Sequence, residues 1–349
     1  MYTILCIMTC RHFLKKNELI TNVLGLREHK LRSNPLVSVE LTELRKKGIA
    51  AMITHLRLKA YGKINLALDV LGRRDNGYHD VRMIMQTVGL HDRIELYRTK
   101  EPGIRLETNL FYLPNNEQNL AYRAAALLME EFGVKEGVSI KLKKFIPVSA
   151  GMAGGSTDAA AVLVGVNRMF DLGFTKKELM ERGVKLGADV PYCIMRGTAL
   201  SEGIGEILTE LPAPPQCHLV IAKPQISVST KAVYGKLRVN EIAPEEHPDI
   251  DGMMAAIKNG DLDGVIERLG NVLETVTVPD HPEIAEIKEI MMENGACGSL
   301  MSGSGPTVFG IYKDRELAEK ACQALREADG GRLTRQVYLT EFYNRKKAR

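Results

Sequence analysis

The sequence predicts an α+β protein of two domains, and three observations support this. Its 349 residues correspond to about two domains of ordinary size. A composition of 45% hydrophobic and 26% charged residues is typical of globular chains. Segments with the apolar period of strands are mixed with helical segments, without the strict alternation of one strand and one helix that a parallel sheet requires.

The first half begins with strands and continues with a helix. Apolar residues alternate along 56–70 and again along 92–98, as they do in half-buried strands. The Asn76–Gly77 dipeptide predicts a turn between them. Segment 118–132 is rich in Ala, Leu, Met and Glu, which predicts a helix, and a strand is expected over 138–145.

A glycine-rich loop, PVSAGMAGGSTD (147–158), follows that strand and leads into a helix expected to end near 170. The capping box Thr175-x-x-Glu178 predicts a second helix to about 187. The proline-dense connection 211–215 then precedes a predicted strand at 217–222. We therefore place a domain boundary at Pro215, giving domains over 52–215 and 216–345.

The second half predicts helices and strands in mixed order. The expected elements are helices near 250–270 and 281–294, a strand at 307–312, a helix at 314–328 and a strand at 335–340. A second glycine-rich loop, GSLMSGSGP, occupies 298–306.

Residues 1–51 differ in charge from the rest of the chain. They hold nine of the 47 basic and four of the 43 acidic residues, so the remainder has 38 basic and 39 acidic residues. Three interpretations stay open: a disordered extension, a transit peptide of a plastid-type organelle, or upstream sequence preceding a start at Met52. We favour the third, because the globular pattern begins at His55 and four Glu are too many for a transit peptide.

Composition also argues against several classes of protein. The body is nearly neutral and has no Trp and few aromatic residues, which does not favour a nucleic-acid partner. No apolar run is long enough to span a membrane. The six cysteines are scattered without a CxxC pair, so we expect reduced thiols in the cytoplasm.

The loop at 147–158 has the composition of an anion site. Glycines let the backbone approach a phosphate closely, and the first turn of the following helix presents unpaired N–H groups. A tight turn that only packs a helix on a sheet is the alternative. The loop lacks the P-loop and dinucleotide-binding patterns.

Two charged residues near this loop are catalytic candidates. A carboxylate such as Asp158 repels phosphate, so its presence is explained if it takes a proton from a hydroxyl or holds Mg²⁺. Lys63 lies between two strand-like runs and could keep a carboxylate ionised. The alternatives are a carboxylate that only stabilises the helix dipole and a solvated edge lysine.

Five motifs in order resemble the signature of the GHMP small-molecule kinases. They are AYGKINL (60–66), NGYHD (76–80), IPVSAGMAGGSTDAAA (146–161), GADVP (187–191) and SLMSGSGPTVFG (299–310). The resemblance covers about residues 55–345. It implies an N-terminal domain like ribosomal protein S5, a ferredoxin-like C-terminal domain, and an active site between them. Ala153 stands where members commonly carry glycine.

The resemblance also implies roles for residues. Asp158 would be the general base and Lys63 would orient and polarise the same centre. ATP would bind Pro147, Val148, Ser149, Ala150, Gly151, Met152, Ala153, Gly154, Gly155, Ser156 and Thr157. Ser156 would contact the Mg²⁺ that accompanies ATP.

Lys63, Asn65, the Tyr78–His79 pair and the later Gly203–Glu206 segment resemble the branch of the family whose acceptor carries a cytidine diphosphate group. That branch belongs to the non-mevalonate isoprenoid route. Asn65, Tyr78, His79 and Tyr192 would then bind the acceptor. We expect a monomer or homodimer. Another GHMP kinase acting on a mevalonate-like, sugar or homoserine substrate, and a non-catalytic nucleotide-binding regulator, are the alternatives.

Overall fold

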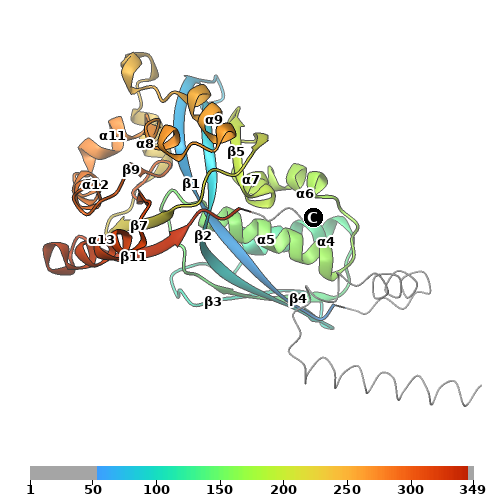
Figure 1. Cartoon of the computed structure of the whole chain (residues 1–349). Helices are drawn as coiled ribbons and strands as arrows, with labels where there is room; N and C mark the ends of the chain where they lie inside the picture. Colours follow the sequence, from blue (N-terminus) through green and yellow to red (C-terminus); the bar gives the residue numbers. More distant parts are fainter. Residues whose placement is uncertain (1–52, 345–349) are drawn as a thin grey trace, which may run out of the picture. The chain divides into compact units, whose positions relative to one another are not determined.

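The computed structural model describes residues 53–344, so the expectations for residues 1–51 lie outside the described part of the chain. Two β-sheets with helices packed on them organise this part (Figure 1). The first sheet has seven strands and the second has four. The mixture of antiparallel and parallel pairs confirms the α+β class.

The first sheet is built mainly on a long antiparallel pair. Its strands are β1 (His55–Arg73), β2 (His79–Thr99), β3 (Gly103–Thr108), β4 (Gly137–Lys143), β5 (Thr198–Glu202), β6 (Ile207–Leu211) and the short β8 (Gly270–Asn271). The order is β3-β4-β2-β1-β8, and β5 pairs with both β2 and β6. β1 and β2 are longer than predicted and are joined by the predicted turn at Asn76–Gly77.

The second sheet is antiparallel, in the order β11-β7-β10-β9. Its strands are β7 (His218–Pro224), β9 (Gly298–Met301), β10 (Val308–Tyr312) and β11 (Thr334–Glu341). Numbered along the chain, the strands stand in the order 4-1-3-2, and helices connect the first to the second and the third to the fourth. This is the ferredoxin-like arrangement that the resemblance implied.

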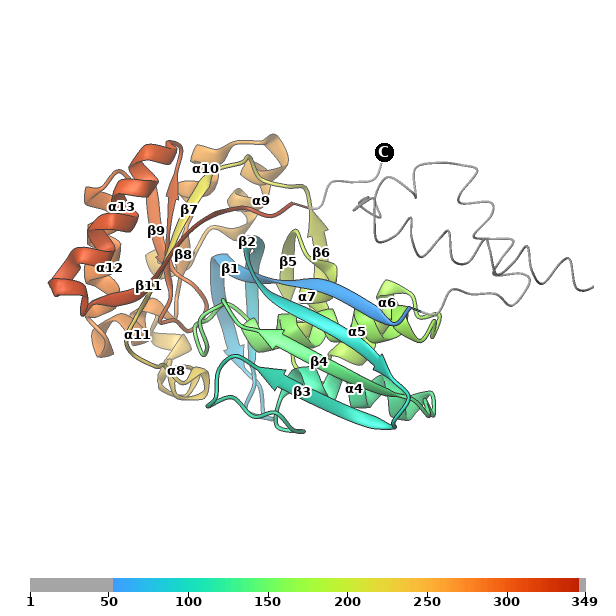
Figure 2. The same cartoon turned by 90° about the horizontal axis from the view of Figure 1, so that it is seen from below.

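Helices cover one face of each sheet. On the first domain they are α4 (Leu120–Glu131), α5 (Gly154–Met169), α6 (Lys176–Gly183) and α7 (Val190–Met195). The second half carries α8 (Thr230–Lys236), α9 (Ile250–Asn259), α10 (Leu262–Ile266), α11 (Glu274–Asp280), α12 (Glu283–Glu293) and α13 (Arg315–Glu327), with short 3₁₀ turns at Val239–Glu241, Pro244–Glu246 and Ala328–Gly331. Figure 2 shows α4 and α5 against the first sheet and α12 and α13 against the second.

The predicted starts of α4 and α6 agree with the structure, whereas α6 ends at Gly183, before the predicted end near 187. Asn119 caps α4 by accepting from the backbone of Ala121, and the capping box of Thr175 and Glu178 is formed at α6. The short elements α7, α8, α11, β3, β5, β6 and β8 were not predicted, since each is too brief to show a clear period. Strand β9 lies in the segment 298–306, which was predicted as a loop.

A continuous apolar core joins the two sheets. In β7, Leu219 and Ile221 face the first sheet, while Val220 and Ala222 face the helices of their own domain. Ile64 of β1 and Ile84 of β2 belong to the same cluster as Leu219 and Ile221. Because apolar burial contributes roughly 25 cal/mol per Å², this shared core holds the two sheets in one arrangement.

The pairing of β1 with β2 is irregular around Lys63 and Asn65. Register shifts fall between Tyr61 and Lys63 and between Asn65 and Ala67. A bulge bends a strand and re-aims its side chains. Ile64 therefore faces the shared core, while Lys63 and Asn65 point to the opposite side.

The described residues contain no helix long and apolar enough to span a membrane.

Close packing of α5 on the sheet depends on Gly165. A Cβ atom there would lie 2.4 Å from Leu96 Cδ1 and 2.6 Å from Leu58 Cδ1. We expect Gly165→Val to lower the free energy of unfolding by about 1–3 kcal/mol, because overpacking forces the sheet and helix apart. Urea unfolding measures this.

Gly235 in α8 is the matched control, because nothing lies within 4 Å of a Cβ built there. Gly235→Ala should leave stability unchanged or raise it by up to about 1 kcal/mol. Equal unfolding curves for Gly165→Val and the unmodified protein would contradict the close packing.

Candidate active site

The loop between β4 and α5 adopts a conformation that exposes its backbone. Ser149, Gly151 and Ala153 all have positive φ angles, of 51°, 70° and 55°. Ala153 thus occupies the left-handed region that glycine prefers, which agrees with the glycine that the resemblance leads us to expect here. Lys63 N donates to Met152 O at 3.2 Å and ties the loop to β1.

The N-terminus of α5 leaves backbone donors available. No side chain caps this 16-residue helix. The first N–H groups of a helix have no partner within it, and they carry the positive end of its dipole. Gly155 is exposed and Ser156 is half-buried in the first turn. Among the predicted phosphate-binding residues, Gly155 and Ser156 therefore present accessible backbone at the N-terminus of α5.

A second glycine-rich loop closes against the first. A Cβ on Gly151 would lie 2.0 Å from Ser302 O, so only glycine allows this contact. Ser302 Oγ donates to Gly151 O at 3.1 Å. A Cβ on Gly303 would lie 3.2 Å from Gly151 O and 3.5 Å from Asn65 Oδ1. The loop of the second domain thus meets both the phosphate loop and β1.

Beneath the phosphate loop lies a buried cluster of three charged residues. Lys144 Nζ donates to Asp158 Oδ2 at 2.6 Å and also to Asp92. Asp92 Oδ1 further accepts from Ile146 N at 2.8 Å. Burial alone would lower the pKa of Lys144, but the charges of Asp158 and Asp92 raise it overall. Lys144 was not predicted as a functional residue.

This cluster argues against the predicted role of Asp158 as general base. Asp158 is only 2% exposed, its Oδ2 is bound to Lys144, and its Oδ1 is buried without a hydrogen-bond partner. Burial raises the pKa of Asp158 well above its usual range, although Lys144 opposes this. A base must lie within hydrogen-bond reach of the proton it takes. Asp158 instead anchors α5 to β4.

Lys63 does not pair with Asp158. Its Nζ donates to Asn65 Oδ1 at 2.7 Å, and both side chains are buried. Asn65 Nδ2 in turn contacts Met83 Sδ at 3.1 Å. Asn65 is fully buried in this arrangement, between Lys63 and the loop that carries Gly303.

A different carboxylate, Asp189, shares its surroundings with Lys63. Both charges act on the buried thiol of Cys193, whose pKa is raised by burial and by Asp189 and lowered by Lys63. Asp189 is half-exposed at the start of α7 and does not cap that helix with its side chain. It was overlooked as a catalytic candidate, although GADVP was among the motifs of the resemblance.

Segment 187–189 also lies beside the phosphate loop. A Cβ on Gly187 would lie 3.9 Å from Ser156 Oγ. Asp189 therefore follows directly after a segment that contacts the first turn of α5. Asp189 is thus a half-exposed carboxylate two residues after Gly187, which lies near Ser156.

Tyr78 and His79 lie at the turn between β1 and β2, as predicted, and the structure adds Tyr234. Tyr78 is 58% exposed. The His79 ring lies 5.1 Å from the ring of Tyr234 on α8. Burial and then the charge of Arg73 lower the pKa of His79. Burial and, to a lesser extent, the charge of Asp189 raise the pKa of Tyr234.

Tyr192 does not occupy a binding position. It is 1% exposed, and its hydroxyl donates to Gly197 O at 2.7 Å and bonds Thr87 Oγ1 at 2.9 Å. A side chain enclosed in this way cannot stack on a bound base. The prediction that Tyr192 binds the acceptor is therefore not supported, because α7 turns it into the core.

The described residues contain no group of three or more His, Cys, Asp or Glu side chains that could hold a metal ion. Ser156, the predicted Mg²⁺ ligand, is therefore not part of such a group in the described residues. Mg²⁺ commonly binds through one or two protein groups and substrate phosphates, so Ser156 fits a metal that arrives with a nucleotide.

Comparison with known proteins agrees with this geometry. The family model "GHMP kinases N terminal domain" matches residues 119–197, and "GHMP kinases C terminal" matches residues 253–330. The 4-diphosphocytidyl-2-C-methyl-D-erythritol kinase of Lachnospira eligens is 56% identical over 82% of this chain and 98% of its own length. The enzyme of the same name from Lachnoclostridium phytofermentans is 52% identical over 83% and 98%.

The fold is also similar to those of solved kinase structures. A crystal structure of 4-(cytidine 5'-diphospho)-2C-methyl-D-erythritol kinase is 32% identical, with a TM-score of 0.70 over 83% of this chain and all of the other. Homoserine kinase from Cytophaga hutchinsonii, 19% identical with a TM-score of 0.66 over 84% and 96%, shares the fold. The chain therefore belongs to the GHMP kinases and, among them, to the family of the 4-diphosphocytidyl-2-C-methyl-D-erythritol kinases.

Proposed function

We propose that this protein transfers the terminal phosphoryl group of ATP to the C2 hydroxyl of 4-diphosphocytidyl-2-C-methyl-D-erythritol, in the non-mevalonate route to isoprenoid precursors. The observation that carries this proposal is the 56% identity to a kinase named for that acceptor, over 98% of the relative's length. The exposed donors at the start of α5 support a phosphate-rich second substrate.

The phosphates of ATP would lie on the loop 147–157. The free N–H groups of the first turn of α5 would donate to phosphate oxygens, where the helix dipole also favours negative charge. Ser156 would contact Mg²⁺, which supplies charge neutralisation on those oxygens. Gly155 has open space except for Leu120 Cδ1 at 3.5 Å from a built Cβ, which suits close approach of a phosphate.

Asp189 would serve as the general base. Its carboxylate would take the proton of the C2 hydroxyl while the hydroxyl oxygen forms a bond to the γ-phosphorus. The bond from that phosphorus to the bridging β–γ oxygen breaks, and ADP leaves with its electron pair. Lys63 would hold the attacking oxygen and the transferred group in position, because phosphoryl transfer depends mainly on positioning and electrostatics.

The cytidine group would bind between the exposed ring of Tyr78 and the rings of His79 and Tyr234. An aromatic face stacks on any base, and an imidazole can read its polar edge. Burial lowers the pKa of His79 and so favours the neutral ring, and a neutral imidazole has one donor and one acceptor nitrogen. Asn65 would act indirectly, by fixing Lys63.

We infer that the enzyme works in the cytoplasm, as a monomer or homodimer. The cysteines of the described residues are all free, and three of them are buried: Cys193, Cys217 and Cys322. Burial raises the pKa of Cys217 to about 12. Protonated thiols of this kind persist in a reducing compartment.

Coupled measurement of ADP release tests the activity. We expect turnover with 4-diphosphocytidyl-2-C-methyl-D-erythritol and ATP, and at least about a hundredfold lower kcat/KM with methylerythritol phosphate, because the latter lacks the group that Tyr78, His79 and Tyr234 would bind. Mevalonate and homoserine serve as further acceptors. Preference for any of these over the cytidine compound would contradict the proposal.

Two isosteric substitutions distinguish the catalytic role proposed for Asp189 from the structural role of Asp158. Asp189→Asn should lower kcat by about 10²–10⁴-fold, because the amide cannot accept the proton, and should leave the melting temperature nearly unchanged. Asp158→Asn should instead lower the free energy of unfolding, since breaking a buried ion pair costs about 3–5 kcal/mol. Its folded fraction should keep more than a tenth of the activity.

The assignment to Asp189 fails if Asp158→Asn is stable but inactive while Asp189→Asn turns over normally. Circular dichroism melting of both variants is measured beside the kinetics, so that loss of fold and loss of chemistry are distinguished.

The aromatic group makes a separate prediction. Tyr234→Ala should raise the KM of the acceptor about 5–150-fold, because stacking on a base contributes ~1–3 kcal/mol, and should change the KM of ATP much less. Tyr192→Phe is the control: it removes two core hydrogen bonds and should affect stability only. An unchanged acceptor KM in Tyr234→Ala would show that Tyr234 is not part of the cytidine site.

A further inference from the structure

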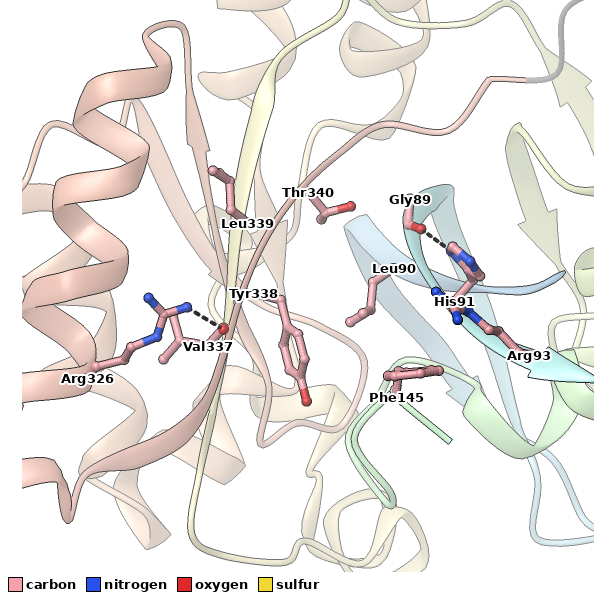
Figure 3. Close-up of a pocket in the computed structure, with 10 residues that line it drawn as sticks. All are labelled: Gly89, Leu90, His91, Arg93, Phe145, Arg326, Val337, Tyr338, Leu339 and Thr340. Atoms are coloured by element: carbon pink, nitrogen blue, oxygen red, sulfur yellow. Dashed lines mark hydrogen bonds between the residues drawn. The ribbon is translucent and has the colours of Figure 1, made fainter. Parts of the chain in front are cut away.

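Residues 340–344, which we call the C-terminal segment, carry the chain from β11 of the second domain onto the middle of β2 in the first. A Cβ atom on Gly89 of β2 would lie 2.7 Å from Thr340 Oγ1, so the end of β11 lies directly against β2 (Figure 3). Phe342 follows, is 2% exposed and forms a β-bridge with Val88. The C-terminal segment therefore joins the two domains.

This segment meets β2 where the pairing of β2 with β1 is irregular. Lys63 of β1 stands opposite Thr87. The next pair is Tyr61 opposite His91, so three residues of β2 face a single residue of β1 between the two pairs. An irregularity of this kind bends the strands and leaves backbone groups outside the ladder. Tyr343 N donates to Thr87 O at 2.8 Å, so the C-terminal segment pairs with β2 at this point.

Thr87 links the C-terminal segment to both candidate catalytic residues. It is 1% exposed and stands directly opposite Lys63. Thr87 Oγ1 accepts from Gly197 N at 2.9 Å, and Thr87 N donates to Gly197 O at 3.0 Å. Gly197 lies two residues after α7, the helix that begins next to Asp189. The backbone of Tyr343 thus holds the residue that connects the strand of Lys63 with α7.

The side chain of Tyr343 makes a second contact beside Lys63. Its ring stacks on the ring of Tyr61, with 3.9 Å between the ring centres and an angle of 19° between the planes. Tyr61 lies two residues before Lys63, and its carbonyl accepts from Thr157 Oγ1 of α5 at 2.7 Å. The guanidinium of Arg196, the residue after α7, lies 5.3 Å from the centre of the Tyr61 ring. Tyr61 is therefore a junction of β1, α5 and α7.

A segment that only joined the two domains would need no more than Phe342, which is buried in the core shared by the two sheets. Tyr343 is only half-buried, so it adds less apolar burial than Phe342 does. Its backbone and its ring nevertheless both contact residues next to Lys63. These contacts point to a role in the geometry of the site.

We propose that Tyr343 is a positioning residue for phosphoryl transfer. Its contacts with Thr87 and Tyr61 hold the part of β1 that carries Lys63 in the place that the reaction requires. The inference rests on the proposed function and adds to it a residue of the second domain that acts through these neighbours. Because phosphoryl transfer depends on positioning, a small displacement of Lys63 lowers the rate strongly.

Kinetics of Tyr343→Ala test the proposal, because this substitution removes the ring and keeps the backbone bond to Thr87. With 4-diphosphocytidyl-2-C-methyl-D-erythritol, kcat should fall about 10–100-fold, as misplacement of a catalytic group does. The KM of ATP should change less than about threefold, since the loop 147–157 is unaltered. Tyr343→Phe keeps the stacked ring and should restore kcat to within about threefold of the unmodified protein.

Tyr338→Ala is the matched control, because it also removes a tyrosine ring from β11. Tyr338 lines a cavity of about 420 Å³ together with Leu90 and Phe145 (Figure 3). Among residues 53–344, the rings that contact Tyr61 are those of His91 and Tyr343. Tyr338→Ala should therefore lower the melting temperature at least as much as Tyr343→Ala and leave kcat unchanged.

Hydrogen exchange supplies a readout that does not depend on the reaction. Lys63 N donates to Met152 O, so its amide reports whether β1 is held against the phosphate loop. In Tyr343→Ala, amides of residues 60–66 should exchange about tenfold faster than in the unmodified protein, because local opening becomes easier. Tyr338→Ala should leave their exchange unchanged.

Three results would overturn the proposal. One is a kcat of Tyr343→Ala within about twofold of that of the unmodified protein. Another is an equal loss of kcat in Tyr343→Ala and Tyr343→Phe, and the third is an equal loss in Tyr343→Ala and Tyr338→Ala. If the unmodified protein phosphorylates none of the acceptors, the proposed function fails, and exchange over residues 60–66 then decides whether Tyr343 holds β1: unchanged exchange would refute this and faster exchange would support it.

Discussion

Lys144 is held between Asp158 and Asp92 in the interior, and the geometry of the candidate active site depends on that contact. Moving a charged group out of water costs several kcal/mol, so each buried charge needs an oppositely charged or hydrogen-bonding partner. Such a cluster fixes the positions of the segments it joins more than it raises the free energy of unfolding. Here it joins the residue after β4, the middle of β2 and the second turn of α5. Asp92 also accepts from the amide of Ile146, where the phosphate loop begins.

The other parts of the candidate site are held in place by contacts with the loop that this cluster supports. The loop 147–157 is fixed at its base by the cluster, at its middle by the bond from Lys63 N to Met152 O, and at its tip by the approach of Gly151 to Ser302. The shared apolar core holds the second domain, and with it the loop 302–305, against the first. A rigid frame therefore surrounds the N-terminus of α5, which no side chain caps, and preorganised donors at such a position are useful for phosphoryl transfer.

Local patterns in the sequence predicted the elements and the position of the loop well. The period of two marked β1 and β2, composition marked α4, the capping box marked α6, and the glycine-rich segment marked the candidate anion site. Local sequence patterns do not show which charged side chains contact one another in the folded protein. Asp158 follows a phosphate loop in sequence, yet its side chain turns inward to Lys144, fourteen residues earlier in the chain.

The same reason explains Tyr192 and Tyr234. Tyr192 lies next to the quoted motif GADVP, but a six-residue helix turns it into the core. Tyr234 lies 155 residues after His79 and meets it only because the second domain packs against the turn 74–78. Asp189 stood in a quoted motif, and its role became arguable only when the structure showed it half-exposed at the start of α7, two residues after Gly187, which lies near Ser156. Residues brought together by tertiary contacts are those that the sequence alone left unassigned.

The most direct test of this account is a crystal structure of the enzyme with a non-hydrolysable ATP analogue and 4-diphosphocytidyl-2-C-methyl-D-erythritol. We predict that the C2 hydroxyl oxygen lies about 2.6–3.2 Å from a carboxylate oxygen of Asp189, while Lys144 remains bound to Asp158 and Asp92. A C2 hydroxyl bound to Asp158, with Lys144 displaced from the cluster, would contradict it.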